Sequence, residues 1–314
     1  MTSPAPEIAV VGEALMDVVE AGDDEPRLAR PGGSPYNVAL GLARLGRRAA
    51  YVGRLSRDPL GQLLRAHAER SGVDLSYAVD AAEPSTVALV TLDDAGAAQY
   101  RFGVDGTADF AFTDAELAHV PSTVAAVHFG SLASWLGPGD AAIARRVAAA
   151  RAAGAAVTYD PNVRPHLQPD ATAARAQVEQ AVRLAHLVKM SEEDLAWTHP
   201  GEAPDDVARA WLAAGAAVVV VTHGGRGATA HTASGSVRRT PPAIEVVDTV
   251  GAGDAFMSGL LDALLRRRLL TPDALLTLDD PVLAGVLDDG ALVAAVTCTR
   301  AGANPPRRAD VFGS

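Results

Sequence analysis

The chain has 314 residues, of which 48% are hydrophobic, with one cysteine and a formal net charge of −11. This length supports a large buried core, and a lone Cys298 cannot form an internal bridge, so a small disulfide-stabilised secreted protein is excluded. The 27 Lys and Arg against 38 Asp and Glu leave no basic surface for nucleic acid. There is no signal-peptide pattern, and no apolar run approaches the roughly 18 residues of a membrane span. We therefore expect a cytoplasmic protein with neither a membrane nor a nucleic-acid partner.

Short apolar β-runs alternate with helical patterns along most of the chain. Parallel strands need crossover helices between them, so this alternation predicts an α/β fold with a mostly parallel central sheet flanked by helices. The expected strands cover residues 8–11, 49–52, 125–129, 155–159, 187–190 and 217–222.

The first two helices carry clear end signals. Ser34 followed by Pro35 predicts an N-cap with proline at the first helical position, and Gly46 predicts the C-cap. The segment from Asp58 to Gly72 repeats these signals. Two stretches, 17–29 and 86–104 with a turn at 93–96, break the alternation and predict hairpins that could form a small separate sheet.

A glycine-rich segment, Asp248-Thr249-Val250-Gly251-Ala252-Gly253-Asp254, precedes a long apolar helix pattern. Small residues at a helix N-terminus leave backbone N–H groups that bind an anion. The residues alone leave Asp254 open to two interpretations. It either stabilises the helix dipole, or it is a base that deprotonates a hydroxyl beside a transferring phosphoryl group.

A second glycine segment, Gly32-Gly33-Ser34-Pro35-Tyr36-Asn37, opens the first long helix. The chain resembles the PfkB sugar kinases, the ribokinase-like family, at GGSPYNVALGLARLGRRAAYVGRLSRDPLG and at DTVGAGDAFMSG. The resemblance runs from about Ile8 to Asn304. It implies one ribokinase-like kinase domain over residues 1–314, with a small β-sheet lid from about 13–33 and 85–105 and the active site between lid and body.

The resemblance also implies residue roles. Asp254 would be the general base, and the backbone amides of Gly251, Ala252, Gly253 and Asp254 would hold the transferring phosphoryl group. Phosphoryl transfer depends mainly on positioning and charge stabilisation, so such a small set of groups suffices. The sugar would be bound by Gly12, Asp17, Gly32, Gly33, Asn37, Tyr100, Phe102, Arg164 and Asp254.

Two of these assignments remain open. Arg164 ends a Tyr159–Arg164 segment that resembles the DPNxR segment of fructokinase and 2-keto-3-deoxygluconate kinase relatives, and it either approaches the substrate or pairs with a surface acid. Tyr100 and Phe102 alternate along a strand and share one face. They either roof the sugar or fill a small lid core.

The nucleotide would lie near Lys189-Met190-Ser191-Glu192-Glu193-Asp194, which resembles the family's N-x-x-E segment with Ser191 for Asn and Asp194 for Glu. The shorter Asp194 implies a water-mediated Mg²⁺ contact. Lys189 is the only lysine in the chain, which favours a role near phosphates. A Walker A loop is absent. By resemblance, ATP would contact Lys189, Ser191, Thr222, Gly224, Gly227, Gly251 and Gly253.

Asp248 and the loop over residues 297–304 resemble a monovalent-cation site, so ATP, Mg²⁺ and K⁺ are the expected cofactors. Lid strands that pair between subunits would give a homodimer.

The acceptor is inferred from three short segments. Asp160-Pro161-Asn162 stands where sugar-phosphate kinases commonly carry KPN, which favours an unphosphorylated sugar. Together with residues 12–17 and 297–300 it looks most like bacterial fructokinases. We expect ATP-dependent phosphorylation of fructose; the alternatives are 2-keto-3-deoxygluconate kinase, then ribokinase or a nucleoside kinase.

Two functions of other classes are disfavoured. A dinucleotide oxidoreductase would need G-x-G-x-x-G after the first strand, which is absent. A non-catalytic sugar-binding regulator would have no need of Asp254 behind an intact Gly251–Gly253 run.

Overall fold

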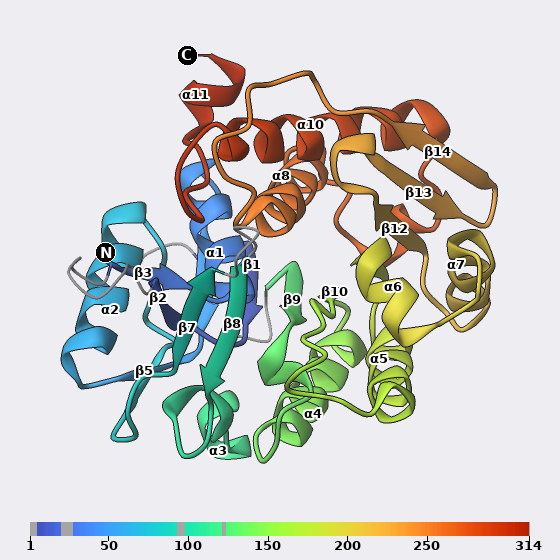
Figure 1. Ribbon diagram of the computed structural model, residues 1–314. Coiled ribbons are helices and arrows are strands. Elements are labelled where there is room, and N and C mark those ends of the chain that lie inside the picture. Colours follow the sequence, from blue (N-terminus) through green and yellow to red (C-terminus); the bar gives the residue numbers. More distant parts are fainter. Residues whose placement is uncertain (1–4, 20–27, 93–97, 121–123, 314) are drawn as a thin grey trace.

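The computed structural model describes residues 5–19, 28–92, 98–120 and 124–313. An eight-stranded sheet lies at its centre, with six parallel strands and an antiparallel pair, β13 and β14, at one edge (Figure 1). In spatial order the strands are β14 (Gly235–Arg239), β13 (Ala228–Thr232), β12 (Val218–Thr222), β11 (Leu187–Ser191), β10 (Ala156–Asp160), β9 (Ala126–Gly130), β1 (Ile8–Val11) and β4 (Ala49–Val52).

The predicted mostly parallel sheet is confirmed, and each predicted run is a strand whose ends differ by at most one residue from the expected ones. Alternate side chains of the strands enter two separate cores, because side chains point to opposite faces along a strand. In β12, Val218 and Val220 enter one core, and Val219 and Val221 enter the other. Such uniformly apolar strands are typical of a sheet covered on both faces.

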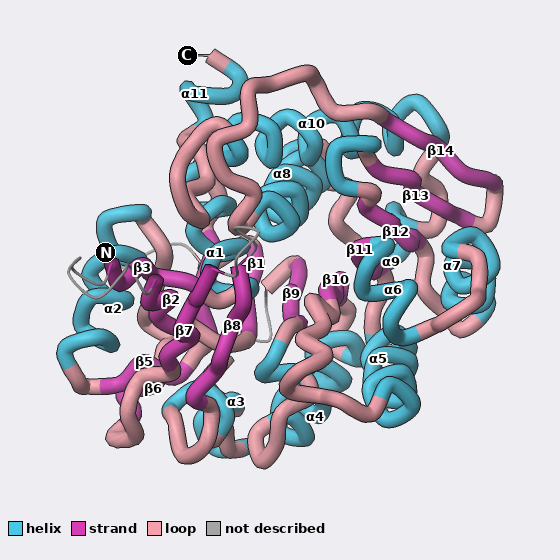
Figure 2. Tube along the Cα trace, in the orientation of Figure 1, coloured by secondary structure: helices cyan, strands magenta, loops and turns pink. Residues whose placement is uncertain are grey.

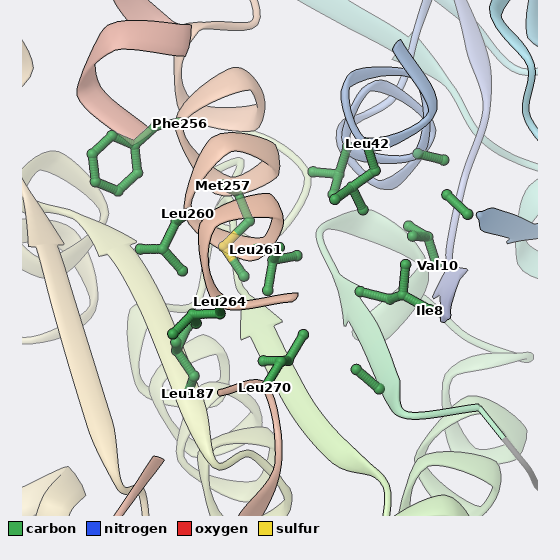
Figure 3. Close-up of a cluster of buried hydrophobic side chains, with 14 of the residues drawn as sticks. Ile8, Val10, Leu42, Leu187, Phe256, Met257, Leu260, Leu261, Leu264 and Leu270 are labelled. Atoms are coloured by element: carbon green, nitrogen blue, oxygen red, sulfur yellow. The ribbon is translucent and has the colours of Figure 1, made fainter. Parts of the chain in front are cut away.

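Helices cover both faces of this sheet. Figure 3 shows the first core, where Ile8 and Val10 of β1 lie near Leu42 of α1, and Leu187 of β11 lies near Leu264 of α8. The first face carries α1 (Ser34–Arg44), α2 (Pro59–Ser71), α8 (Ala252–Arg266), α9 (Pro272–Leu275) and α10 (Asp280–Cys298). The second face carries α3 (Asp114–Leu117), α4 (Asp140–Ala152), α5 (Ala171–Leu184), α6 (Glu192–Thr198) and α7 (Pro204–Ala213).

The end signals of the first two helices have different outcomes. Helix α2 begins after Asp58, whose carboxylate accepts from the Gly61 N–H at 2.7 Å, and ends at a left-handed Gly72, as predicted. The predicted caps of α1 are each one residue off. The N-cap is Gly33, Ser34 is the first helical residue, and the C-cap is Leu45. The Ser34 hydroxyl does not cap the helix, because it donates a hydrogen bond to a carboxylate elsewhere in the fold.

A second sheet has the strand order β3-β2-β7-β8 and lies beside the main one (Figure 1). Strands β7 and β8 fall inside the predicted range 86–104, whereas β2 and β3 overlap the predicted range 17–29 and extend beyond its two ends. Strand β2 joins β7 in parallel. The expected turn at 93–96 lies outside the described residues. The bounds are β2 (Leu15–Val19), β3 (Leu28–Gly32), β7 (Val87–Leu92) and β8 (Ala98–Gly103); β5 (Arg54–Ser56) pairs with β6 (Val79–Ala81), and α11 (Arg308–Phe312) ends the chain.

Helix α10 is long and apolar enough to cross a membrane by length and composition, and about half of its apolar stretch is buried. It packs along α8 and β14 (Figure 2). Its Asp288 and Asp289 pair with Arg239 and Arg266. Core helices of soluble proteins pass the same test of length and hydropathy, and α10 is such a helix in this fold.

Candidate active site

A pocket of about 390 Å³ opens between the second sheet and the carboxyl ends of the parallel strands. Ligands of open α/β sheets bind at this edge. The pocket is lined by Glu13, Leu15, Asp17, Gly33, Ser34, Asn37, Phe102, Ser131, Leu132, Asn162, Arg164, Thr249, Val250, Gly251 and Asp254.

Asp254 lies in the first turn of α8 and faces this pocket. Its two carboxylate oxygens accept hydrogen bonds from Ser34 Oγ at 2.7 Å and Asn37 Nδ2 at 2.8 Å. Burial raises the pKa of Asp254 to about 6, and the hydrogen bonds from Ser34 and Asn37 oppose that rise. The carboxylate is therefore ionised at neutral pH and is a stronger base than an ordinary aspartate.

A close helix crossing brings these three residues together. Gly41 of α1 lies against Ser258 of α8, where a Cβ on Gly41 would be only 2.3 Å from Ser258 Oγ. Glycine at this position therefore lets the two helices approach, which places Ser34 and Asn37 at the start of α8.

The N-terminus of α8 borders the pocket at Gly251 and Asp254, and one of the backbone amides expected to bind an anion there is already hydrogen-bonded. Gly251 is the N-cap at φ 76°, and a Cβ there would be 2.7 Å from the Cβ of Ala303. The Ala252 N–H donates to Thr249 O at 3.1 Å, so this amide is not open to a phosphoryl group, contrary to the expectation. First-turn N–H groups have no partner within a helix, which leaves those of Gly253 and Asp254 for an anion.

Lys189 reaches the same anion site from β11. Its Nζ donates to Asp160 Oδ2 at 2.9 Å, and a Cβ on Gly253 would lie 3.1 Å from that Nζ. Burial acts to lower the pKa of Lys189, but the ion pair with Asp160 and the nearby Asp254 and Asp194 outweigh it and raise the pKa. The ammonium thus stays charged at the mouth of the anion site.

Asp17 of β2 faces Asp254 across the pocket. Burial raises the pKa of Asp17 to about 6; Arg164 lowers it and Asp254 raises it further. Gly32, on the paired strand β3, makes room for this side chain, because a Cβ there would lie 2.3 Å from Asp17 Oδ2.

Arg164 lines the pocket and is half-buried. Its guanidinium donates to Asn162 Oδ1 at 2.8 Å and to Val163 O at 2.9 Å. Within the described part of the chain it has no ion-pair partner, so the surface ion pair left open by the sequence is not observed. Its charge remains available to the pocket.

The predicted sugar-site residues divide into two groups. Six of the nine line the pocket, namely Asp17, Gly33, Asn37, Phe102, Arg164 and Asp254. Neither Gly12 nor Gly32 lines the pocket. A Cβ on Gly12 would lie 2.4 Å from Pro35 Cγ, and Gly32 packs against the side chain of Asp17. The backbone of Tyr100 pairs with Val90, but its side chain lies outside the described residues.

Sequence reasoning missed several pocket residues, among them the polar Glu13 and Ser131. Glu13 is buried, and its Oε2 accepts from Ala133 N at 3.1 Å; burial raises its pKa. Both residues follow the carboxyl ends of predicted strands, β1 and β9, which is the signal that could have found them. The other missed residues are Leu15, Ser34, Leu132, Asn162, Thr249 and Val250.

The family model for pfkB carbohydrate kinases matches residues 5–309. The chain belongs to this family. It is 34% identical to a fructokinase of Rhizobium leguminosarum bv. trifolii, over 88% of this chain and 85% of the relative. The structure of a fructokinase with bound ATP from Xylella fastidiosa matches with a TM-score of 0.86 at 27% identity, covering 94% of this chain and 93% of that one.

A third comparison agrees. A fructokinase double mutant of Vibrio cholerae O395, in its form bound to fructose, ADP and a potassium ion, matches with a TM-score of 0.82 at 26% identity, covering 96% and 95% of the two chains. The expected ribokinase-like fold and enzyme class are confirmed: this pfkB-family chain is an ATP-dependent sugar kinase.

The residues expected to bind the kinase's nucleotide gather at the ends of β11 and β12. Ser191 and Thr222 are register partners across these strands. Gly224 and Gly227 follow in the next turn with φ values of 56° and 96°. The two loops are tied together by Glu192, whose Oε2 lies 2.9 Å from His223 Nδ1 and whose Oε1 accepts from Arg226.

Two further features are an acid in α6 and an exposed apolar loop before α8. Burial, followed by the charge of Asp160, raises the pKa of Asp194 to about 6. The loop that leads into α8 exposes three aliphatic side chains, which sequence reasoning did not single out: Ile244, Val246 and Val247.

Asp248 connects the two loops expected to form the cation site. Its Oδ1 accepts from Val250 N at 3.0 Å, and its Oδ2 accepts from Gly302 N at 2.7 Å. The backbone N–H of Asp248 donates to Cys298 O at 3.2 Å. The structure thus brings Asp248 against the 297–304 loop, as the sequence predicts.

Proposed function

We propose that this pfkB-family kinase transfers the γ-phosphoryl group of ATP to a hydroxyl of fructose. The observation that carries this proposal is the placement of Asp254. Its carboxylate faces a sugar-sized pocket, and burial raises its pKa. The same residue sits in the first turn of a helix whose N–H groups point at that pocket.

In the proposed reaction Asp254 takes the proton of the attacking hydroxyl. The hydroxyl oxygen forms a bond to the γ-phosphorus while the bond to the β–γ bridging oxygen breaks, and ADP leaves with that electron pair. The amides of Gly253 and Asp254 and the ammonium of Lys189 stabilise the charge on the transferring group, since fixed charges act strongly in a site that excludes water. Asp17, Asn37 and Arg164 orient the sugar.

The charge of the pocket supports a neutral acceptor. Glu13, Asp17 and Asp254 line it, whereas Arg164 is the one cation among the lining residues. Three acids against one cation disfavour an acceptor that already carries a phosphate, because like charges close together in a partly desolvated site repel. The second candidate, 2-keto-3-deoxygluconate, is favoured by one observation: the Arg164 guanidinium is open to a carboxylate.

The nucleotide is proposed to lie across the ends of β11 and β12. Lys189, Ser191, Thr222, Gly224 and Gly227 surround the phosphate and ribose side, and the aliphatic loop at 244–247 offers an apolar surface to the base. In this proposed arrangement the γ-phosphate would lie next to Gly251 and Gly253, between the rest of the ATP molecule and the sugar.

Asp194 and Asp160 fit a magnesium ion carried by ATP. Asp160 Oδ1 is buried without a hydrogen-bond partner, and both side chains supply the oxygen ligands that Mg²⁺ prefers. No cluster of three metal-ligating side chains occurs among the described residues, which agrees with an ion held mainly by phosphates and water. When bound, Mg²⁺ would neutralise phosphate charge, and Asp194 and Asp160 would hold it through its water ligands.

Asp248 and the 297–304 loop fit a monovalent cation, for which we propose K⁺. Each carboxylate oxygen of Asp248 accepts one N–H and retains a further lone pair, and the loop contributes carbonyl oxygens. The site adjoins the N-terminus of α8, so an ion there would fix the loop that carries Gly251.

We further propose that the whole chain acts as one cytoplasmic kinase domain, with the second sheet as a lid over the sugar. The edge strands β3 and β8 each pair on one side within the described residues, which leaves an edge for a homodimer. Light scattering of the purified protein tests the dimer.

A substrate screen tests the proposed function. Purified enzyme with ATP and Mg²⁺ should phosphorylate fructose at least about tenfold more efficiently than fructose 6-phosphate. The reason is that the phosphate of fructose 6-phosphate would bring a negative charge into the pocket that no cation there compensates. Ribose, adenosine and 2-keto-3-deoxygluconate are the comparison acceptors. A preference for 2-keto-3-deoxygluconate would assign Arg164 to its carboxylate, and a preference for fructose 6-phosphate would contradict the proposal.

A further inference from the structure

His166 is a residue to which neither the family motifs nor the proposed chemistry gives a role. It follows the DPN segment after β10, four positions beyond Asn162 and outside the residues that line the pocket. Its imidazole stacks on the ring of Phe102, with the centroids 5.3 Å apart and the planes 17° from parallel.

This stack joins two separate sheets. Phe102 belongs to β8, at the edge of the lid, whereas His166 belongs to the loop at the carboxyl end of the main sheet (Figure 1). Phe102 also lines the sugar pocket. The aromatic contact therefore lies next to the pocket and fixes the position of a ring that lines it.

The chemistry of the pair suits a contact between neutral rings. Burial and the neighbouring Arg164 lower the pKa of His166 below its ordinary value, so the imidazole is neutral at the pH of the cytoplasm. Near-parallel aromatic pairs at such distances stabilise a fold by more than the burial of their apolar surface alone would. Arg164 holds its own guanidinium on Asn162 and Val163, which keeps it out of the stack.

We propose that His166 is a positioning residue for the sugar: it seats Phe102 as an aromatic roof over the acceptor and so holds the lid against the body. This inference rests on the proposed sugar-kinase function. Loss of the imidazole would free Phe102 to leave the pocket, which weakens sugar binding but leaves Asp254 and the anion site unchanged.

The test compares His166→Ala with His166→Phe, which keeps a ring for stacking, and with His119→Ala as a matched control at an exposed histidine just after α3. An aromatic contact of this kind is worth about a two- to tenfold change in binding, so His166→Ala should raise the sugar KM by that factor with kcat and the ATP KM nearly unchanged. His166→Phe should restore the KM, and His119→Ala should match the wild type.

A double variant separates coupling from a general loss of structure. In a Phe102→Leu background, His166→Ala should add nothing further to the sugar KM, because the two rings act together. An unchanged sugar KM in His166→Ala, or a rise that His166→Phe does not reverse, would overturn the inference while leaving the kinase assignment intact. A wild-type enzyme that phosphorylates no sugar in the screen would instead overturn the proposed function itself.

Discussion

Ser34 and Asp254 lie 220 positions apart in the chain and share a hydrogen bond of 2.7 Å, in which the serine hydroxyl donates to the buried carboxylate. This contact is one of two hydrogen bonds that, together with the charge of Lys189, oppose the effect of burial on the pKa of Asp254. It ties the start of α1, which carries proposed sugar-binding residues, to the start of α8, which carries the proposed anion site. The basicity of the proposed catalytic carboxylate is thus set by a residue of the other helix.

Removing that hydroxyl should shift the pH profile. Activity requires ionised Asp254, so kcat falls as the pH drops through the carboxylate's pKa of about 6, with the nearby Asp17 contributing to the same limb. A hydrogen bond to a charged group is worth about one pKa unit or more, so Ser34→Ala should move the acid limb to higher pH by roughly one unit. At pH 8.5 its kcat should approach that of the wild type. An unshifted limb, as expected of the exposed control Ser234→Ala, would contradict this role.

Lys189 should matter to both folding and catalysis. Lys189→Met removes the ion-pair partner of buried Asp160, and breaking a buried pair costs about 3–5 kcal/mol, so the thermal midpoint should fall clearly. The kcat should also fall by roughly 10²-fold, the usual loss on removing a group that stabilises transition-state charge.

A double variant separates these two effects. Lys189→Met with Asp160→Asn removes the unpaired charge and should recover most of the thermal midpoint. Its kcat should stay low, because it lacks both Lys189 and the proposed Mg²⁺ ligand Asp160. Recovery of kcat together with stability would show that Lys189 acts only as a structural partner of Asp160.

Asp109 should make the stability of the fold depend on pH. It follows β8 in a short 3-10 turn and accepts the Ala14 N–H at 2.8 Å, and burial raises its pKa to about 7. Because the folded pKa lies above that of the unfolded chain, the stability it contributes is complete at low pH and is lost as the pH rises from about 4 to 7. The side chain introduced by Asp109→Asn cannot ionise, so the stability of this variant does not show the same decrease with rising pH.

The measurement is the difference in thermal midpoint between Asp109→Asn and the wild type. We expect this difference to favour the variant more at pH 8 than at pH 4.5. The effects of the other acids on the thermal midpoint cancel, because both proteins contain them. The same difference at both pH values would mean that Asp109 titrates normally in the fold.

Asp248 should confer a dependence on monovalent cations. Turnover should rise when K⁺ replaces a bulky organic cation at constant ionic strength, because the loop before Gly251 is then held by the ion. Asp248→Ala should lose this response, together with the tie to Gly302. Equal rates in both salts for the wild type and the variant would exclude a functional cation site.

The sequence predicted those features that depend on neighbours in the chain. The caps of α2 at Asp58 and Gly72 form as expected because each uses groups within a few residues. Ser34 did not act as the predicted N-cap, since the Asp254 carboxylate, a strong hydrogen-bond acceptor, takes its hydroxyl across the fold. Local signals carry no information on such distant competition.

The site divides in the same way. The Gly251–Asp254 segment and Asp17 were predicted from motifs, but the pairing of Lys189 with Asp160 depends on two strands being neighbours in the sheet. The Ala252 amide was misassigned because its bond to Thr249 O depends on the exact path of the loop. The Phe102–His166 stack joins two sheets, and no sequence spacing relates the two rings.

The most direct test of the account is the kcat of Asp254→Asn at saturating sugar and ATP. The variant can fold without strain, because Asn37 Oδ1 has no hydrogen-bond partner among the described residues, and an amide flip would let it accept from the amide introduced by the substitution. Loss of a general base costs about 10²- to 10⁴-fold in rate, so kcat should fall by at least roughly 10², with both substrates still bound and the thermal midpoint not lowered. A purified variant that keeps more than about a tenth of the wild-type kcat would contradict the account, since a carboxylate that merely stabilised the helix dipole would affect stability by only about 0.3–1 kcal/mol.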